Sequence, residues 1–415
     1  MSAWRLSRRA QRTLSSLSSL AEVRSSATFS SRLDAAIATP MSPGDAASLI
    51  TSADAARLTL DAAMVTTHLH TQSRIAAFEG NGFYTIGPCG EENLSAVALA
   101  LRPTDPIALH YRHLGTLVAR QLQRGVELRS LLLGRARGYT VSTSDGVTGG
   151  AHCSLGADHR YDFLVTSTLA SQGPQAVGRA VAIEHLRAEC WPADAISFVS
   201  CGDGSVNNAE WLSAVNAAEY VEHRRRACPT LFLVSDNGVS ISLKGNGWVD
   251  RWVEQRLGMQ VYRACGTRIA NLMTQANAAA DYVRSSRRPA LLLVSGLPRR
   301  FGHAATDRQD QYLTPDEIAA AQACDPVAIS AGEMVLAGVI SREEVLRRYA
   351  QIGEMAEEAF VRARAEPREM SREQLLARVA PLAVRGVSKG CADGGEEEAG
   401  VGVNVGVGVG VGVGG

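Results

Sequence analysis

The chain has 415 residues, of which 46% are hydrophobic, and its formal net charge is zero. This length accommodates one large domain or two of ordinary size. A neutral chain offers no basic surface for nucleic acid, and no apolar run approaches membrane-spanning length, so we expect neither partner.

The first 33 residues differ in composition from the rest. They are rich in arginine and serine and contain a single acidic residue, Glu22. This composition is typical of a cleavable mitochondrial transit peptide. A chloroplast transit peptide, or a disordered basic N-terminal segment without a targeting function, has a similar composition. The eight cysteines are scattered without a Cys-x-x-Cys pair, which fits a reducing compartment. We therefore predict a transit peptide over residues 1–33 and location in the mitochondrial matrix.

Helices come first in the predicted order of elements. An alanine-rich helical pattern runs over residues 49–77, and another over 112–133. A third helix, whose alanines and glycines permit close packing, is expected over 168–188. This first half of the chain is therefore predicted to be mostly helical.

Short apolar runs then alternate with helical segments. Residues 195–201, 230–235 and 289–295 are apolar runs flanked by turn residues, which indicates buried strands. Helical patterns over 208–226 and 269–285 separate them. This alternation predicts an α/β fold, in which a mostly parallel sheet carries helices on both faces. Ligands of such sheets bind beyond the carboxyl ends of the strands.

The end of the chain divides into two parts. Residues 315–379 are charged and helical in pattern, which predicts a helical C-terminal extension. After an acidic patch, the sequence alternates valine and glycine up to Gly415, and so many glycines raise the entropy cost of ordering. We expect one folded unit over residues 42–385 and a disordered Gly/Val-rich tail over 386–415.

Two similar motifs follow the first two predicted strands. Gly202-Asp203-Gly204 follows one strand and Asp236-Asn237-Gly238 the next, and 237 − 203 = 34 residues separate the carboxylate from the amide. Each motif alone is also an ordinary turn sequence. Because adjacent parallel strands would bring both to one edge, we expect a carboxylate, an amide oxygen and a nearby carbonyl to bind Mg²⁺ beside a phosphate.

Nucleotide sites of the common types are not expected. The first strand is not followed by Gly-x-Gly-x-x-Gly, and the sequence has no Walker-type Gly-Lys-Ser/Thr loop.

At these residues the chain resembles the alpha subunits of thiamine diphosphate-dependent 2-oxo acid dehydrogenases, particularly the branched-chain type. The resemblance runs from about Phe83 to Asp325. It is carried by blocks that occur in the family's order: FYTIGPCGEE (83–92), HYRHLG (110–115), STLASQGPQAVG (167–178), GDGSVNNAEWLSAVNAA (202–218), SDNGVSIS (235–242) and RFGHAATD (300–307). The resemblance implies a thiamine diphosphate-binding fold.

The resemblance also implies which residues bind the cofactor. The matching positions are Tyr111, Arg112, Ser167, Leu169, Gly202, Asp203, Gly204, Asn237 and His303. Tyr111 and Arg112 match the pair that contacts the diphosphate, where the fork of an arginine can bind phosphate oxygens bidentately. Ser167 and Leu169 match positions that flank the aminopyrimidine ring.

The resemblance implies a metal site as well. Asp203, Asn237 and the carbonyl of Val239 match the Mg²⁺ ligands. A segment that binds K⁺ in some relatives corresponds to Ser167, Ser171 and Gln172.

His303 matches the active-site histidine at the mouth of the cofactor channel. A histidine can assist proton transfer near neutral pH. A lone loop histidine is more often inert, so the expectation rests on its setting in GHAATD.

The chain departs from the family's pattern at several positions. Ser235 stands where branched-chain relatives often carry an arginine that points toward the diphosphate. We therefore expect fewer protein contacts with the diphosphate at this position. Ala304 and Ala305 cover the place of the serine that kinases modify in many animal relatives. The pair Tyr312-Leu313 replaces a common Tyr-Arg.

The activity that the resemblance implies is oxidative decarboxylation of a small 2-oxo acid in branched-chain amino acid catabolism, with transfer of the acyl group to the lipoyl group of an acyltransferase core. The implied partner is a beta subunit in an α2β2 assembly, which supplies the glutamate that activates the cofactor. The alternatives are a pyruvate dehydrogenase alpha subunit and a cofactor-binding pseudoenzyme or assembly subunit.

Overall fold

The structure is a computed structural model. It describes residues 25–82, 86–88, 90–150, 156, 159–163, 168–186, 191–256, 258–304, 307–368 and 371. Residues 1–24 of the expected transit peptide and the expected tail over 386–415 lie outside this part of the chain.

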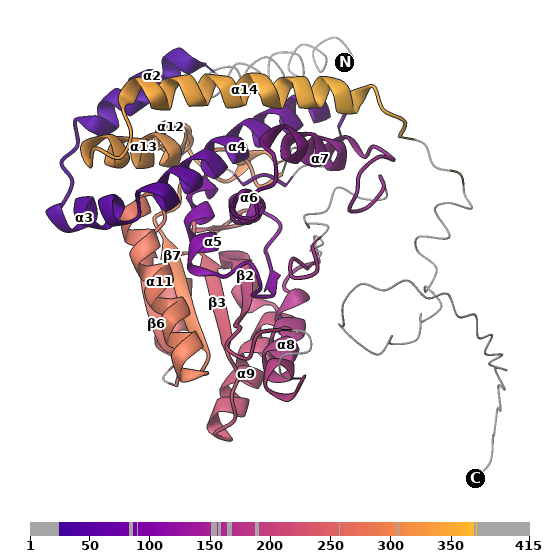
Figure 1. Ribbon diagram of the computed structural model, residues 1–415, viewed down its shortest axis with the longest axis vertical. Helices are drawn as coiled ribbons and strands as arrows, with labels where there is room; N and C mark the ends of the chain where they lie inside the picture. Colours follow the sequence, from indigo (N-terminus) through magenta and orange to yellow (C-terminus); the bar gives the residue numbers. More distant parts are fainter. Residues whose placement is uncertain are drawn as a thin grey trace.

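A parallel sheet of five strands forms the centre of the described fold (Figure 1). In spatial order the strands are β1 (Ile107–Ala108), β2 (Ser197–Gly202), β3 (Thr230–Ser235), β7 (Ala290–Ser295) and β6 (Gln260–Cys265). Every neighbouring pair is parallel. The predicted parallel sheet and its three apolar strands are thus confirmed.

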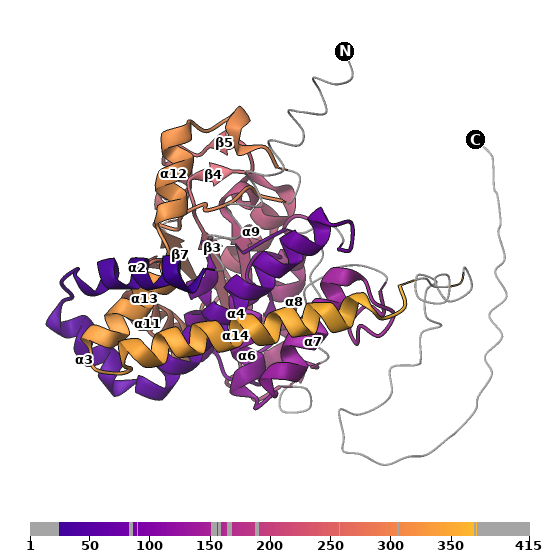
Figure 2. The same ribbon diagram turned by 90° about the horizontal axis from the view of Figure 1, so that it is seen from above.

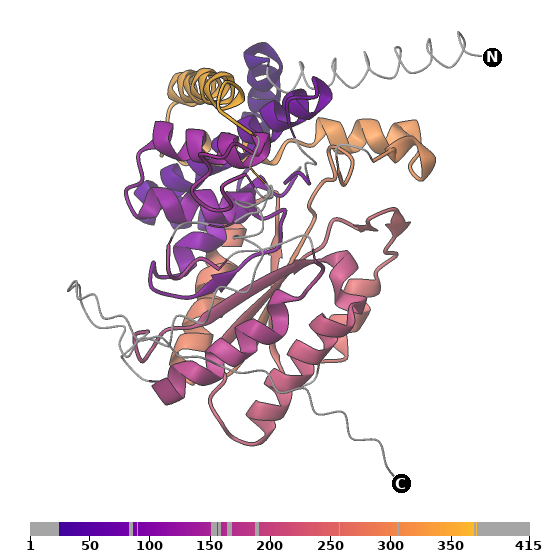
Figure 3. The same ribbon diagram turned by 90° about the vertical axis from the view of Figure 1, so that its right-hand side faces the viewer.

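Residues that alternate along the central strands contribute to two separate hydrophobic clusters. Phe198 packs on one face of β2, and the next residue, Val199, packs on the other. The first cluster joins the sheet to α4 (Ala53–Phe78), α5 (Val97–Ala100), α6 (Leu114–Gln123) and α11 (Ile269–Ser286). The second joins it to α8 (Gln172–Leu186), α9 (Ala209–His223) and α10 (Trp248–Glu254). Both faces are therefore covered by helices, as the continuous apolar strands predict (Figure 3).

A layer of further helices packs around α4. The helices α3 (Pro43–Thr51), α7 (Leu128–Thr140), α13 (Pro326–Leu336) and α14 (Arg342–Arg364) contact α4, and α2 (Ser26–Ile37) packs on α13 and α14. The α4 helix is buried at every position from 62 to 73, so it is surrounded on all sides. The helical C-terminal extension is confirmed up to residue 364 as α12 (Pro315–Ala323), α13 and α14, and residues 372–379 of the expected extension lie outside the described residues.

The short elements lie near the carboxyl ends of the strands. They are the 3-10 turns η1 (Glu92–Ala96), η3 (Asp203–Asn207) and η4 (Gln309–Gln311), and the antiparallel hairpin of β4 (Val239–Ser240) and β5 (Leu243–Lys244). The hairpin lies beside α12, to which the Lys244–Glu317 ion pair joins it (Figure 2).

The folded unit begins earlier than the expected boundary at residue 42. The helix α2 is part of the core, because Phe29 stacks on Tyr349 with ring centroids 3.8 Å apart and Leu33 is fully buried. Arg32 also forms an ion pair with Asp325 at 3.2 Å. Cleavage of a transit peptide after residue 33 would remove these contacts.

One predicted helix is divided in the structure, and one strand was not predicted. The predicted helix over 112–133 is two helices, α6 and α7, because the chain turns at Gly125 with a positive φ of 77°. The edge strand β6 was not predicted, since its polar and half-exposed residues do not form an apolar run.

Among the described residues, no helix has the length and apolarity needed to cross a bilayer. The four cysteines in the same part of the chain, Cys201, Cys228, Cys265 and Cys324, are unbridged.

Candidate functional site

The two glycine-containing motifs meet at one edge of the sheet. The last residue of β2, Gly202, is directly beside the last residue of β3, Ser235. Asp203 therefore follows one strand end and Asn237 follows its immediate neighbour, as the sequence predicts. The Asn237 side-chain oxygen accepts a hydrogen bond from the Val239 N–H at 3.0 Å, which fixes the start of the β4–β5 hairpin.

Asp203 has one carboxylate oxygen that remains available. Its Oδ1 accepts a hydrogen bond from the Gly204 N–H at 2.9 Å. Its Oδ2 is buried and has no partner among the described residues. Burial raises the pKa of Asp203 to about 6, against the opposing effect of Arg112. A buried acidic oxygen of this kind is the ordinary setting of a cation ligand.

Arg112 carries the complementary charge. Its side chain is buried, and its Nε donates to Glu91 Oε1 at 2.9 Å. Its Nη2 has no partner within the described chain. A Cβ at Gly202 would lie 2.4 Å from this Nη2, so only glycine allows the guanidinium to rest on the end of β2. Nη2 is therefore a cationic donor directly beside the strand end.

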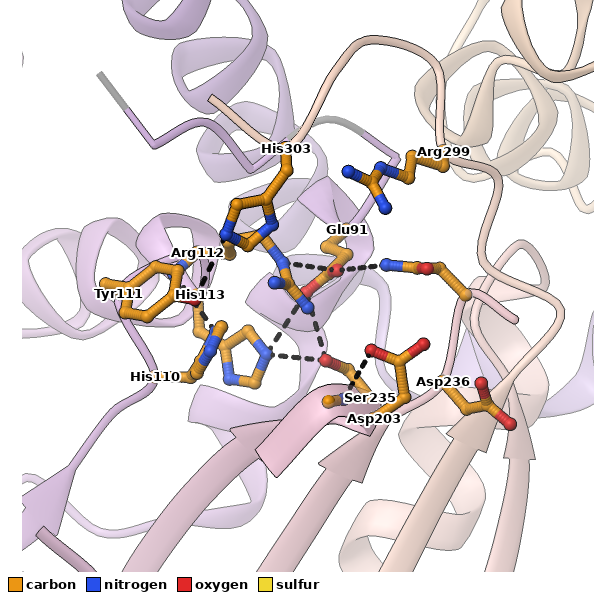
Figure 4. Close-up of polar contacts among 12 residues, drawn as sticks. Glu91, His110, Tyr111, Arg112, His113, Asp203, Ser235, Asp236, Arg299 and His303 are labelled. Carbon is orange, nitrogen blue, oxygen red and sulfur yellow. Dashed lines mark hydrogen bonds and ion pairs between the residues drawn. The ribbon is translucent and has the colours of Figure 1, made fainter. Parts of the chain in front are cut away.

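Glu91 joins the groups of this edge (Figure 4). Besides Arg112, it accepts hydrogen bonds from the Ser235 hydroxyl at 3.1 Å and, more weakly, from the Asn237 amide at 3.4 Å. The His113 Nε2 lies 3.2 Å from its second oxygen. Burial alone would raise the pKa of Glu91, but Arg112 and His113 together outweigh it and hold the pKa below its usual range. Glu91 is thus a buried carboxylate shared by four side chains.

His113 connects Glu91 to the sheet. Its Nδ1 lies 2.7 Å from the Ser200 hydroxyl, and its Nε2 lies 3.0 Å from the Ser235 hydroxyl. Burial lowers the pKa of His113, against the effect of Glu91. The contacts fit a neutral imidazole whose Nε2 proton faces Glu91 and whose Nδ1 accepts from Ser200. From the sequence, Ser235 was expected only to lack the arginine of the relatives. In the structure it is part of a closed hydrogen-bond network.

His303 approaches the same edge from the loop after β7. Its Nε2 lies 3.3 Å from the Tyr111 hydroxyl, and the two rings meet edge to face. Its backbone N–H donates to Asp307 at 2.6 Å. Burial, followed by the charges of Arg112 and Arg299, lowers the pKa of His303 to about 4. The imidazole is therefore neutral at physiological pH and can accept a proton or a hydrogen bond.

The carbonyl of Val239 has a donor already. Arg299 Nη1 donates to it at 3.0 Å and also contacts the Ile241 carbonyl, while Arg299 Nη2 pairs with Asp307 at 3.0 Å. A carbonyl oxygen has two acceptor positions, so one remains for a cation.

The remaining expected residues are less closely connected to this edge. Ser167 lies outside the described residues. Leu169 is half-buried in the turn before α8. The Ser171 hydroxyl donates to the Thr168 carbonyl at 3.2 Å, and the Gln172 amide donates to the Ser200 carbonyl at 3.0 Å.

Sequence reasoning gave no role to Glu91, His113 or Arg299. Glu91 and His113 both stand inside blocks that carry the resemblance, and the adjacent acids Glu91 and Glu92 in an otherwise weakly charged segment were the available signal. Arg299 had no such signal, because its contacts with the hairpin come from residues 58 and 60 positions away.

The residues at this edge fit a metal ion with a bound phosphate. The unpaired atoms Asp203 Oδ2 and Arg112 Nη2 are buried and carry opposite charges. Buried charged groups without partners are costly, so a ligand that brings a cation and an anion together would satisfy both. Among the described residues there is no cluster of three or more His, Cys, Asp or Glu side chains that could hold a metal.

Comparisons with known proteins agree with this chemistry. Residues 64–371 match the family described as "Dehydrogenase E1 component". The chain is 28% identical over 237 residues to "2-oxoisovalerate dehydrogenase subunit alpha 2, mitochondrial" of Arabidopsis thaliana, which covers 55% of this chain and 46% of the relative. It is 27% identical over 245 residues to the corresponding alpha subunit of Caenorhabditis elegans (57% and 52%) and 26% identical over 265 residues to that of Mus musculus (61% and 55%).

The chain spans about half the length of the curated relatives it matches. The family match covers most of the chain, including every element that contributes to the sheet edge. The chain therefore belongs to the dehydrogenase E1 component family, whose members depend on thiamine diphosphate.

Proposed function

We propose that this chain is the alpha subunit of a branched-chain 2-oxo acid dehydrogenase. Such an enzyme decarboxylates a small 2-oxo acid and transfers the acyl group to a lipoyl group. The observation that carries the proposal is the pair of buried, oppositely charged and unpaired atoms, Asp203 Oδ2 and Arg112 Nη2, at one sheet edge. The names of the relatives support the branched-chain type over the pyruvate type.

In this proposal the chain binds the diphosphate end of the cofactor. Asp203, Asn237 and the Val239 carbonyl hold Mg²⁺, which prefers few protein oxygens together with phosphate oxygens. Arg112 contributes its free Nη2 to the diphosphate, and Tyr111 lies beside it. When bound, thiamine diphosphate supplies the nucleophile for the 2-oxo carbon and accepts the electron pair released with CO₂.

His303 takes the proton-handling role. Its neutral imidazole contacts the Tyr111 hydroxyl, and Asp307 holds its backbone N–H, at the side of the site opposite the strand ends (Figure 4). A neutral imidazole can accept a proton from one group and return it to another, which suits reductive transfer of the acyl group to the lipoyl disulfide, whose S–S bond breaks as one sulfur takes the acyl group and the other takes a proton. Intact Asp203, Asn237 and His303 favour an enzyme over a pseudoenzyme.

The proposal includes partners and location. A beta subunit completes the site in an α2β2 assembly, and the complex works with a lipoyl-bearing acyltransferase core in the mitochondrial matrix. K⁺ bound near Ser167, Ser171 and Gln172 is a further part of the proposal, supported by the neighbouring Ser171 hydroxyl and Thr168 carbonyl oxygens.

Reconstitution with the beta subunit and comparison of two substrates test the proposal. We expect 2-oxoisovalerate to be decarboxylated with a higher kcat/KM than pyruvate, and both reactions to require Mg²⁺ and thiamine diphosphate. A preference for pyruvate would favour a pyruvate dehydrogenase alpha subunit over the branched-chain assignment. A complex inactive on both substrates would contradict the proposed enzymatic activity.

A further inference from the structure

Arg74, on the long helix α4, contacts the loop that carries His303. Its Nη2 donates to the Gly302 carbonyl at 2.7 Å and lies 3.5 Å from the Ala304 carbonyl. These two carbonyls belong to the residues directly before and after His303. One guanidinium therefore holds the backbone on both sides of the histidine.

Arg74 is itself fixed in place. Its Nε donates to His70 Nε2 at 2.9 Å, and its guanidinium carbon lies 5.4 Å from the centre of the Phe301 ring. His70 is buried, and a Cβ at Gly87 would lie only 1.9 Å from its ring, so the imidazole is closely packed. Burial lowers the pKa of His70 well below its usual value, which keeps its Nε2 available as an acceptor.

The helix that carries Arg74 is a rigid support. The α4 helix is buried continuously up to Ser73, and it contacts α6, α7, α13 and α14. Ala304 also forms an isolated antiparallel bridge with Ile86. The loop is thus attached to the helical layer on one side, while Asp307 holds the His303 N–H on the other.

We propose that Arg74 is a positioning residue that sets the direction of the His303 imidazole toward Tyr111. This inference rests on the proposed function of His303 but concerns a different residue, more than two hundred positions away in the chain. Positioning of this kind affects rate steeply, since misplacement of a reacting group by about 1 Å can reduce the rate about a hundredfold. Arg74 makes no described contact with Asp203 or Arg112, so we expect its replacement to leave the groups that bind Mg²⁺ and the diphosphate in place.

The test uses Arg74→Met in the reconstituted complex, which keeps the apolar stem and removes the guanidinium. We expect kcat to fall about ten- to a hundredfold, with the affinity for thiamine diphosphate within about twofold of the wild type. Arg74→Lys keeps the charge but cannot reach His70 and Gly302 together, so it should show a partial loss and serves if the methionine variant folds poorly. Unchanged kcat in a folded variant would overturn the proposal.

Arg57→Met is the matched control. Arg57 lies on the same helix and also donates to a backbone carbonyl, that of Val339 at 3.0 Å, away from the site. The control should lose stability and keep kcat within about twofold. Equal rate losses in both variants would show that Arg74 acts only through the fold.

A double-mutant cycle with His303→Ala separates positioning from general stability. The single His303→Ala change should reduce turnover about a hundred- to ten-thousandfold, and Arg74→Met should then add no more than about twofold. Additive losses would contradict the inference.

Hydrogen exchange on the full chain gives a readout that needs no activity. Arg74→Met should speed exchange of the amides from 299 to 304, and Arg57→Met should not. If the wild-type complex decarboxylates no 2-oxo acid, the proposed function fails. The exchange result would still show whether Arg74 holds the loop that carries His303. Unchanged exchange in Arg74→Met overturns the inference alone.

Discussion

Glu91 and Glu92 are neighbours with similar burial, but their pKa values are shifted in opposite directions. Both side chains are almost fully buried. Glu91 pairs with Arg112, whose charge holds the Glu91 pKa below its usual range. Burial raises the pKa of Glu92 to about 7, because Arg300 only partly offsets it and Asp325 adds a like charge. The same residue type therefore serves as a fixed anion at the site and, beside it, as an acid that gains or loses its proton near neutral pH.

Replacement of Glu91 should lower the free energy of unfolding, because it leaves Arg112 buried without a partner. In Glu91→Ala the guanidinium stays buried without its anion, and loss of one partner of a buried pair typically costs roughly 3–5 kcal/mol. Urea unfolding of the full chain should show a loss in this range. Glu91→Gln, which keeps an oxygen acceptor for the Arg112 Nε, should lose less. A loss under about 1 kcal/mol in Glu91→Ala would contradict the pairing.

Glu92→Gln should change how stability depends on pH. The folded-state pKa of Glu92 is about 7 and its ordinary value is 4.5, so the folded state binds this proton more tightly than the unfolded state. The wild type therefore loses stability as pH rises from about 4.5 to about 7, and glutamine cannot titrate. The free energy of unfolding of Glu92→Gln relative to wild type should rise between pH 5 and pH 7.5. Parallel curves over that range would rule out the raised pKa.

The buried partners of the site could not be predicted from local sequence. Asp203 and Asn237 could, because the alternation of strands and helices places both at neighbouring strand ends. The contacts of Glu91 with Ser235 and Asn237 join residues 144 and 146 positions apart, and neither spacing nor periodicity encodes such contacts. The role of Ser235 needed the same three-dimensional information.

At the scale of elements, the apolar pattern of the sequence predicted the strands that are buried on both faces of the sheet. It missed the elements that are partly exposed. The strands β2, β3 and β7 are buried along almost their whole length and were expected. The edge strand β6 is half-exposed and polar, so its pattern resembles a loop. The helix α2 was missed for another reason: its arginine and serines match a transit peptide in composition, while only Phe29 and Leu33 are buried.

Truncations at two positions should distinguish the expected boundary from the observed one. A chain without residues 1–24 should melt like the full chain, because it keeps α2 complete. A chain without residues 1–33 loses the buried side chains of Phe29 and Leu33, each of which contributes about 1.5–3 kcal/mol when buried. Thermal melting should show a clear loss in the second chain only. If both melt alike, α2 does not belong to the stable core.

At the scale of the whole molecule, one sheet edge receives groups from widely separated parts of the chain. Glu91 precedes the sheet and Arg112 follows β1. Asp203 and Asn237 follow the adjacent strands β2 and β3, and His303 follows β7. The surrounding helices support Glu91 through η1, and they support the His303 loop through Arg74. The fold therefore brings a cation site, an anion site and a neutral imidazole to one place.

The central claim is that this edge binds Mg²⁺ and thiamine diphosphate through the free oxygen of Asp203. Isothermal titration calorimetry of the reconstituted complex, with Asp203→Ala beside the wild type, tests it most directly. We expect the wild type to bind thiamine diphosphate only when Mg²⁺ is present, and Asp203→Ala, with its melting temperature retained, to bind none at either condition. Equal Mg²⁺-dependent binding by the folded variant would contradict the account.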